Sequence, residues 1–305
     1  MSDNRKSVRN MDCLFGPVLS RRLGLSMGVD LLKYKTCNLD CVYCELGRTS
    51  GLTRSRGRFV SPDRVVREIS ARRGESFDHL TFAGSGEPTL SVDLGDVVRQ
   101  AKEIVDAPVA VITNSTLLSH PGVREEVAAA DIILPTLDAF TQGTFRAISR
   151  PEPGLEIEKI IQGLKDLRRE FSGEIWLEVM LVKGMNEHEA ELIARAAESI
   201  NPDRIQLNTV VRTPAEPVEP LSEEEMQQML EIFPGAELIP DWDWSVPAAA
   251  EAEILHLLSR SPCTLEEIAA ELELTGSDAI KYCKILERDG LISSRQREGK
   301  LLFQP

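Results

Sequence analysis

The feature that most constrains the fold is a regular alternation of short apolar segments with longer amphipathic ones. Strand-like segments lie at residues 27–35, 78–84, 108–114, 131–138, 174–182 and 203–211. Helical patterns lie between them, at residues 61–74, 91–105, 120–130, 154–171 and 187–200. Strands that alternate with helices pair in parallel, and the helices then cover the faces of the sheet. The alternation therefore predicts an α/β fold built on a parallel sheet.

The pattern changes near Ala248. Three short helical segments and two strand-like ones follow, at residues 249–261, 264–272, 277–290, 291–296 and 300–305. Thr264 and Glu267 have the spacing of a capping box, and Arg297-Glu298-Gly299 has the composition of a hairpin turn. Three helices followed by a hairpin resemble a winged helix-turn-helix.

These two patterns predict two domains. Residues 1–240 are expected to form the α/β domain with an N-terminal extension and a connector helix, and residues 241–305 the small winged helix-turn-helix domain. The proline-rich residues 211–220 are interpreted as a connecting segment.

Charge and cysteine content indicate the compartment. The formal net charge is -14, but the first 75 residues carry more basic than acidic side chains, so the positive charge is concentrated in the N-terminal part of the chain. No apolar run approaches the roughly 20 residues that a bilayer crossing requires. The cysteines are few for the length, and the first 15 residues show no secretory signal. We therefore expect a cytoplasmic protein with no membrane partner.

Three cysteines within eight residues, Cys37, Cys41 and Cys44, form a C-x3-C-x2-C motif. A structural zinc site needs four protein ligands, usually in two paired halves, and no second half lies nearby in the sequence. Three thiolates on a four-iron cluster leave one iron open to a small molecule. The motif favours such a cluster over zinc or a disulfide framework.

With Tyr43 just before its last cysteine, this motif resembles that of the radical S-adenosylmethionine (radical SAM) superfamily. The resemblance implies that Cys37, Cys41 and Cys44 bind a [4Fe-4S] cluster and that SAM binds the open iron. Reductive cleavage of SAM then yields a 5'-deoxyadenosyl radical that abstracts hydrogen from a substrate. The resemblance also implies a partial (β/α)6 TIM-like barrel, a flavodoxin- or ferredoxin-type electron donor, and a place for Tyr43 near the adenine.

A glycine-rich segment follows the second predicted strand. Glycines allow close backbone approach to a ligand, and a carboxylate accepts hydrogen bonds from an amine. The segment resembles the superfamily's binding site for the methionyl amino group, although a simple strand-to-helix turn would also explain its glycines. Later strand ends are expected to add cofactor contacts, and Glu178 among them could instead face solvent. The predicted cofactor-binding residues are Tyr43, Gly84, Ser85, Gly86, Glu87, Asn114, Glu178 and Asn208.

Arginines gather before the first predicted strand, after the cysteines and after the fourth predicted strand. Arginine recognises phosphate and carboxylate in a bidentate manner, so an anionic substrate, RNA included, is plausible. A solvated loop is the alternative, and RNA is disfavoured by the acidic remainder and the absence of an aromatic ladder. The candidate substrate residues are Arg21, Arg22, Arg54, Arg56, Arg58, Arg146 and Arg150. The sequence identifies no catalytic side chain.

Residues 14 to about 215 also resemble the radical SAM branch related to wyosine-base synthases, which rebuild a guanine in tRNA. Those synthases hold a second cluster on three additional N-terminal cysteines, whereas Cys13 alone precedes the motif here. The resemblance therefore implies a sister group without the second cluster, whose substrate is a modified nucleoside or tRNA, a peptide or a small molecule.

An alternative function is an iron-sulfur redox sensor that regulates transcription through the winged helix. Acidic residues outnumber basic ones from residue 248 onward, although duplex binding needs a basic surface. The sequence thus favours a protein-contacting or substrate-presenting winged helix over a nucleic-acid-contacting one, and an enzyme over a regulator.

Overall fold

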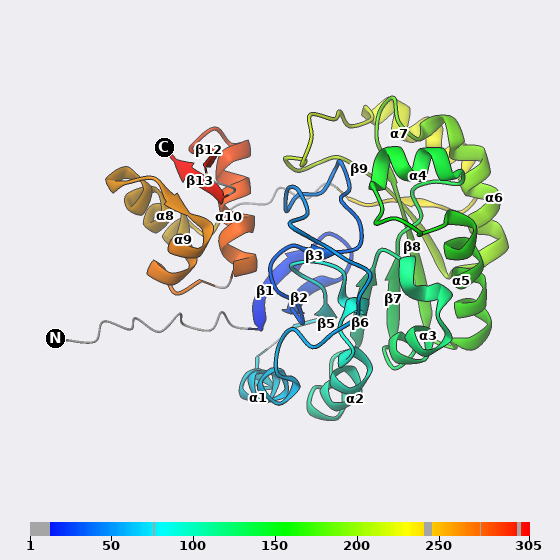
Figure 1. Ribbon diagram of the computed structural model, residues 1–305, viewed down its shortest axis with the longest axis horizontal. Helices are drawn as coiled ribbons and strands as arrows, with labels where there is room; N and C mark the ends of the chain where they lie inside the picture. The colour runs from blue at the N-terminus through cyan, green and yellow to red at the C-terminus, as the bar shows by residue number, and fades with distance from the viewer. Residues whose placement is uncertain (1–12, 76, 241–245, 275, 298–299) are drawn as a thin grey trace. The chain divides into compact units, whose positions relative to one another are not determined.

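The computed structural model describes residues 13–75, 77–240, 246–274, 276–297 and 300–305 (Figure 1). The contacts divide the chain into two compact units, Gly16–Asp243 and Trp244–Pro305 with Met1–Phe15. The domain boundary expected between residues 240 and 241 borders residues outside the described ranges. Each unit is described by itself below.

An eight-stranded sheet forms the centre of the larger unit, in the order β1-β2-β5-β6-β7-β8-β9-β10. All neighbouring pairs from β2 to β10 are parallel. The strands are β1 Leu14–Ser20, β2 Gly24–Val29, β5 His79–Phe82, β6 Val109–Thr113, β7 Ile132–Pro135, β8 Glu174–Leu181, β9 Arg204–Thr209 and β10 Glu237–Leu238. The α/β fold with a parallel sheet is confirmed.

Helices connect these parallel strands, as the helical periodicity of the intervening segments predicted. They are α1 Pro62–Arg72, α2 Leu94–Ile104, α3 Pro121–Val127, α4 Gln142–Ser149, α5 Ile157–Glu170, α6 Ala190–Ile200 and α7 Glu223–Ile232, with 3-10 turns η1 Pro88–Leu90, η2 Thr116–Ser119 and η3 Glu187–Glu189. In α5 the buried Ile157, Ile160, Ile161, Leu164 and Leu167 recur at helical spacing and form one apolar face. Among the described residues, no helix has the length and apolar character that a membrane crossing requires.

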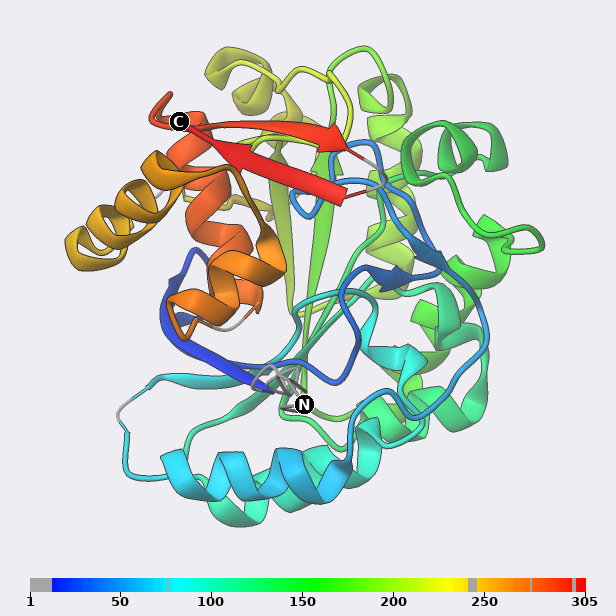
Figure 2. The same cartoon turned by 60° about the vertical axis from the view of Figure 1, so that its left-hand side comes forward.

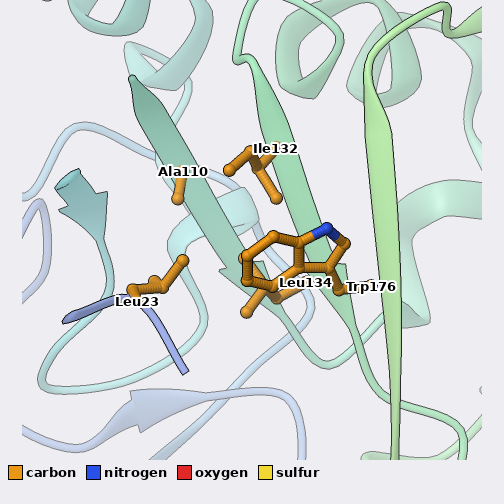
Figure 3. Packing of buried hydrophobic residues seen from close by; sticks show 5 residues of the cluster. All are labelled: Leu23, Ala110, Ile132, Leu134 and Trp176. Carbon is orange, nitrogen blue, oxygen red and sulfur yellow. The ribbon is translucent and has the colours of Figure 1, made fainter. Parts of the chain in front are cut away.

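The two faces of the sheet differ because successive strand residues point to opposite sides. Trp176 of β8 packs with Ala110, Ile132 and Leu134 of neighbouring strands and with Leu23 of the turn between β1 and β2 (Figure 3). Glu178 and Met180 follow Trp176 on the same face of β8, toward the carboxyl end of that strand. The interior of the curved sheet is therefore apolar near the amino ends of its strands and more polar near their carboxyl ends.

The turn between β1 and β2 connects the two edges of the sheet. Arg22 Nη1 donates to Glu178 Oε2 of β8 at 2.6 Å, and Arg21 Nη1 donates to Asn208 Oδ1 of β9 at 3.0 Å. Arg21 Nε also donates to the Pro240 carbonyl oxygen at 2.9 Å, just after β10. Side chains, in addition to strand pairing, thus close the partial barrel.

One strand was predicted with the wrong bounds, and two elements were not predicted. The strand predicted at 27–35 begins at Gly24 and ends at Val29, because Asp30 Oδ1 accepts a hydrogen bond from Leu32 N at 3.0 Å and turns the chain. Strand β1 was not predicted. Helix α4 was not predicted either, although Thr141 caps it by accepting from Thr144 N.

The smaller unit combines three helices with a small sheet, in agreement with the winged helix-turn-helix prediction. Its elements are α8 Ala248–Arg260, β11 Cys263–Thr264, α9 Leu265–Glu271, α10 Gly276–Arg288, β12 Ser293–Arg297 and β13 Lys300–Gln304. The hairpin β12–β13 is antiparallel and β11 pairs with β13 (Figure 2, red strands). Thr264 and Glu267 form the expected capping box. Residues 298 and 299 of the predicted turn lie outside the described residues.

Candidate active site

The cysteine loop lies between two short parallel strands, β3 (Thr36–Cys37) and β4 (Gly51–Leu52). Cys37, Cys41 and Cys44 are free thiols and each is partly buried. The Leu39 amide donates to Cys37 Sγ at 3.5 Å. One short segment thus presents three sulfurs, as the spacing predicted.

Polar side chains inside the loop hold its shape. Asp40 Oδ1 accepts a hydrogen bond from Thr49 N at 2.6 Å, and Asn38 Nδ2 donates to Thr116 Oγ1 at 2.6 Å. Asn38 is completely buried. Both side chains fix the loop against its surroundings.

The glycine-rich segment contacts the cysteine loop directly. Gly86 forms a parallel bridge with Thr36, and Glu87 N donates to the Thr36 carbonyl oxygen at 3.1 Å. A Cβ atom added to Gly86 would lie 1.7 Å from that oxygen. Only glycine allows the two loops to approach this closely.

Asp30, which follows β2, forms hydrogen bonds with the start of the glycine-rich segment. Its Oδ2 accepts from Ser85 N at 2.9 Å and from the Ser85 hydroxyl. Gly84 has a φ of 135°, in the region that favours glycine. Asp30 was not identified from the sequence, because a single carboxylate after a strand is common.

Glu87 is buried, with 2 % of its surface exposed. Its Oε1 accepts from Thr89 Oγ1 at 2.6 Å and from Thr113 Oγ1 at 2.7 Å, and its Oε2 accepts from Asn114 N at 2.7 Å. Burial raises the pKa of Glu87, although these hydrogen bonds act in the opposite direction. A carboxylate oxygen has two lone pairs, so Oε2 can accept one more donor.

Asn114 connects the end of β6 to the cysteine loop. Its Nδ2 donates to Asn38 Oδ1 at 2.7 Å and lies 3.6 Å from Cys37 Sγ. The predicted residue Asn114 is therefore placed against one of the three sulfurs.

Tyr43 and Asp138 form a buried pair beside the loop. The Tyr43 hydroxyl donates to Asp138 Oδ2, and Met180 N donates to Asp138 Oδ1 at 2.8 Å. Burial raises the pKa of Asp138 to about 7. The ring of Tyr43 packs against an apolar cluster that contains Val42 and Ile148. Asp138 was missed because only the fold brings it to Tyr43.

Glu178 and Asn208 meet on neighbouring strands, with Asn208 Nδ2 donating to Glu178 Oε1 at 2.7 Å. Both are buried, 8 % exposed in each case, so the solvent-facing alternative for Glu178 is wrong. Arg22 and Arg21 bond to them as described above. The two predicted cofactor residues therefore lie together in the barrel interior.

Lys35 was not singled out from the sequence. It is 3 % exposed, and its Nζ donates to Cys44 Sγ at 2.9 Å. Burial by itself lowers the pKa of Lys35, but attraction to the ionised sulfur of Cys44 and, more weakly, to those of Cys37 and Cys41 outweighs burial and raises it.

The radical SAM superfamily model matches residues 31–197, which include the cysteine loop, the glycine-rich segment and the four parallel strands from β5 to β8 with their connections. The chain belongs to the radical SAM superfamily. A second model, that of the bacterial regulatory protein arsR family, matches residues 251–294.

Several proteins resemble this radical SAM chain. It is 36% identical over 231 residues to a UPF0026 protein of Methanocaldococcus jannaschii, covering 73% of this chain and 71% of that protein. It is 35% identical over 314 residues to a Brachyspira hyodysenteriae protein named GTPase Obg, covering 98% of this chain but 46% of that protein. The chain thus spans less than half the length of that relative.

More distant similarities extend the comparison. A GTP 3',8-cyclase of Limosilactobacillus fermentum is 29% identical over 154 residues, covering 50% of this chain and 45% of the cyclase. A solved radical SAM methyltransferase from Sphaerobacter thermophilus superposes with a TM-score of 0.53 at 18% identity, covering 70% of this chain and 65% of that one. The latter likeness shows a shared fold.

The residues present fit the cofactors of the radical SAM superfamily, a [4Fe-4S] cluster and SAM. Burial raises the pKa of Cys37 to about 12 and also raises that of Cys41. Without metal both thiols keep their protons, whereas iron displaces the proton and supplies compensating positive charge. Donors from Leu39 and Asn114 point at Cys37 Sγ, as donors do around iron-sulfur centres.

A four-iron cluster does not require a binding site for one single metal ion. Among the described residues, no three histidine, cysteine, aspartate or glutamate side chains are placed to bind one metal ion together. In a four-iron cluster each thiolate binds a different iron, so a single shared ion is not required.

The predicted substrate arginines bond mostly to the chain's own carboxylates. Beyond Arg21 and Arg22, Arg54 pairs with Glu152, Arg56 with Glu126, Arg58 with Asp93 and Arg150 with Glu216. Arg56 also donates to the carbonyl oxygens of Thr89 and Ser91, which follow the glycine-rich segment. Arg146 is exposed on α4 and forms no ion pair within the described residues. The predicted anion site is thus largely a set of internal ion pairs.

The predicted connector 211–220 packs on the cysteine loop. Glu216 N donates to the Val42 carbonyl oxygen at 3.0 Å, and the Glu216 carboxylate accepts from Arg48 and Arg150. Arg212 pairs with Glu45 in the same region. Proline content indicated a linker, but these contacts make the segment part of the site's wall.

Proposed function

We propose that this chain is an enzyme that cleaves SAM reductively at a [4Fe-4S] cluster and abstracts hydrogen from an anionic substrate. The observation that carries the proposal is the contact between Gly86 and Thr36, which joins the glycine-rich segment to the three-cysteine loop. That contact puts thiolates for a cluster and acceptors for an amine side by side at the carboxyl ends of parallel strands, where such barrels carry out chemistry.

The chain's residues have distinct roles in this proposal. When bound, the cluster and SAM would supply a 5'-deoxyadenosyl radical by electron transfer. Cys37, Cys41 and Cys44 would hold the cluster, and the carboxylate of Glu87 would accept a hydrogen bond from the methionyl ammonium. Tyr43 lies next to the loop with its hydroxyl fixed by Asp138, so its ring is held in one orientation.

The substrate is proposed to be anionic and nucleotide-like. The similarity to a GTP 3',8-cyclase supports this class. Gln206 also supports it, because its Oε1 is buried without a hydrogen-bond partner among the described residues and it shares the inner face of β9 with Asn208. An acceptor of this kind is satisfied by a donor such as a nucleobase amine. Arg146, exposed on α4, is proposed to contact the anionic group, whereas a peptide or tRNA substrate is less well supported.

The proposed reaction requires an electron donor, for which we propose a flavodoxin- or ferredoxin-type protein. The winged helix is proposed to contact the substrate or another protein. The one observation that favours the second candidate function, a redox-sensing regulator, is the match to the arsR family; a regulator has no need of the glycine-rich segment beside the cysteines.

The proposed reaction is tested by 5'-deoxyadenosine formation. Anaerobically reconstituted full-length protein is reduced with dithionite in the presence of SAM, and the product is measured by liquid chromatography and mass spectrometry. We expect product from wild type, none above background from Cys41→Ala, and a wild-type amount from Cys263→Ala, a control cysteine in the smaller unit. Absence of product from the cluster-loaded wild type, or equal product from Cys41→Ala, would contradict the proposal.

For the regulator, binding to genomic DNA fragments is measured by gel shift at a stated salt concentration. Specific binding that changes with cluster oxidation, together with absent SAM cleavage, would reverse the order of the two functions.

A further inference from the structure

The ammonium group of Lys35 is buried beside the cysteine loop and contacts a sulfur. Its Nζ donates to Cys44 Sγ at 2.9 Å, and within the described residues it forms no ion pair with aspartate or glutamate. Its side chain therefore contrasts with the arginines nearby, which bond to carboxylates.

A buried cation of this kind requires an anion. Removing an ammonium group from water costs several kcal/mol unless a partner compensates. The group in contact with the Lys35 ammonium is the sulfur of Cys44, which belongs to the same loop as Cys37 and Cys41. Neutral thiols offer little compensation, whereas three thiolates on an iron-sulfur cluster provide a net negative charge.

The backbone at Lys35 adopts a conformation that is unfavourable for lysine. Lys35 has a φ of 57°, a left-handed conformation that glycine or asparagine adopts at lower cost. Gly51 N donates to the Lys35 carbonyl oxygen at 3.1 Å and fixes this conformation. Lysine occupies this position although neither the backbone nor the burial favours it, and such strain concentrates at functional sites.

We propose that Lys35 is the counter-cation of the iron-sulfur cluster and that its fixed charge raises the reduction potential of the cluster. One electron from the low-potential donor enters the site during reduction, no bond breaks and Lys35 keeps its proton, so the negative charge beside the ammonium grows by one. A positive charge stabilises the reduced state more than the oxidised state. The inference rests on the cluster of the proposed function, and it makes Lys35 a positioning and tuning residue, since Lys35 contacts a cysteine rather than the substrate.

The test compares three full-length variants after anaerobic reconstitution. Lys35→Met removes the charge at similar length, Lys35→Arg keeps it, and Lys33→Met removes an exposed cation two residues earlier in the same loop. The midpoint potential is measured by mediator titration with electron paramagnetic resonance. At a given potential we expect Lys35→Met to have an about tenfold lower ratio of reduced to oxidised cluster, equivalent to about 59 mV. Lys35→Arg and Lys33→Met should remain near wild type.

A second measurement separates charge from packing. If Lys35 lacks a strong anion in the metal-free protein, Lys35→Met should melt at or above the wild-type temperature before reconstitution. A clearly lower melting temperature would assign Lys35 a packing role and overturn the inference.

The remaining outcomes are also decisive. An unchanged midpoint potential in cluster-loaded Lys35→Met would overturn the inference, and so would a shift of equal size in Lys33→Met. Lys35→Met could fail to bind iron. In that case, a wild-type iron content and a wild-type midpoint potential in Lys35→Arg would support the role of Lys35 as counter-cation. If neither variant binds iron, that role is contradicted. A wild-type protein that binds no four-iron cluster would instead refute the proposed function itself.

Discussion

Replacement of Gly86 by alanine should separate the two loops that form the site. The added Cβ would lie 1.7 Å from the Thr36 carbonyl oxygen, 2.7 Å from the Thr36 carbonyl carbon and 3.0 Å from Leu32 Cδ1. Contacts below 3.0 Å essentially never occur for a Cβ atom, so the backbones must move apart by at least 1.3 Å, the difference between 3.0 and 1.7 Å. Both nearest atoms belong to the backbone, so no side-chain rotation relieves the clash.

The cost of this movement follows from the contacts that it breaks. The hydrogen bond from Glu87 N to Thr36 O is lost at a cost of about 1 kcal/mol, and overpacking adds ~1–3 kcal/mol. We therefore expect Gly86→Ala to lower the free energy of unfolding by about 2–4 kcal/mol. A shift of about 1 Å in a reacting geometry costs on the order of 100-fold in rate, so 5'-deoxyadenosine formation should fall by that factor.

Urea unfolding of the metal-free protein, followed by circular dichroism, measures the first effect, and the product assay measures the second. Gly122→Ala is the matched control, because a Cβ at Gly122 in α3 meets no atom within 4 Å. Alanine in a helix is favoured over glycine by up to about 1 kcal/mol, so this control should unfold at or above the wild-type urea concentration. Equal stability and equal product formation in Gly86→Ala and Gly122→Ala would refute the reasoning.

Three further predictions concern buried groups of the larger unit. Glu87→Gln should lower the free energy of unfolding by about 1–3 kcal/mol in a urea titration, because an amide donor replaces an acceptor that faces hydroxyl and amide donors. Arg22→Met leaves Glu178 buried without its cation and should cost about 3–5 kcal/mol in the same titration, and Glu178→Gln in the same protein should recover part of the loss. If the double variant is no more stable than Arg22→Met, the ion pair is not the cause. Burial raises the pKa of Asp138 from 3.8 to about 7 in the folded protein. Between these pH values the folded state holds a proton on Asp138 that the unfolded state has released. The free energy of unfolding therefore decreases as pH rises through this range. The metal-free Asp138→Asn variant should therefore lose less stability than wild type between about pH 4.5 and 7, and an identical pH profile of urea midpoints would contradict the assignment.

The sequence predicted the elements whose signal is local. The six parallel strands and the helices between them were readable because each has its own periodicity in the sequence. The end of β2 could not be predicted, because Asp30 turns the chain through a side-chain hydrogen bond that no periodicity reveals. Helix α4 is too short for its period to stand out within a segment that ends in two prolines.

The same distinction applies to the site. Cys37, Cys41, Cys44 and the glycine-rich segment were found because their residues are close in sequence. Lys35 and Asp138 were missed, since their roles depend on contacts that only the fold creates. The ion-pair partners of the arginines were not predicted for the same reason: the sequence shows their charges but not their partners, and Arg56 meets Glu126, which is 70 residues away.

The turn that carries Arg21 and Arg22 has a mechanical consequence. Strands β1 and β10 are the two edges of the sheet, and the guanidinium groups of this turn bridge the gap between these edges. Loss of the two guanidinium groups would remove the hydrogen bonds to Glu178, to Asn208 and to the Pro240 carbonyl oxygen, but it would leave the hydrogen bonds between paired strands intact. The two arginines therefore join opposite sides of the sheet through contacts that strand pairing does not supply.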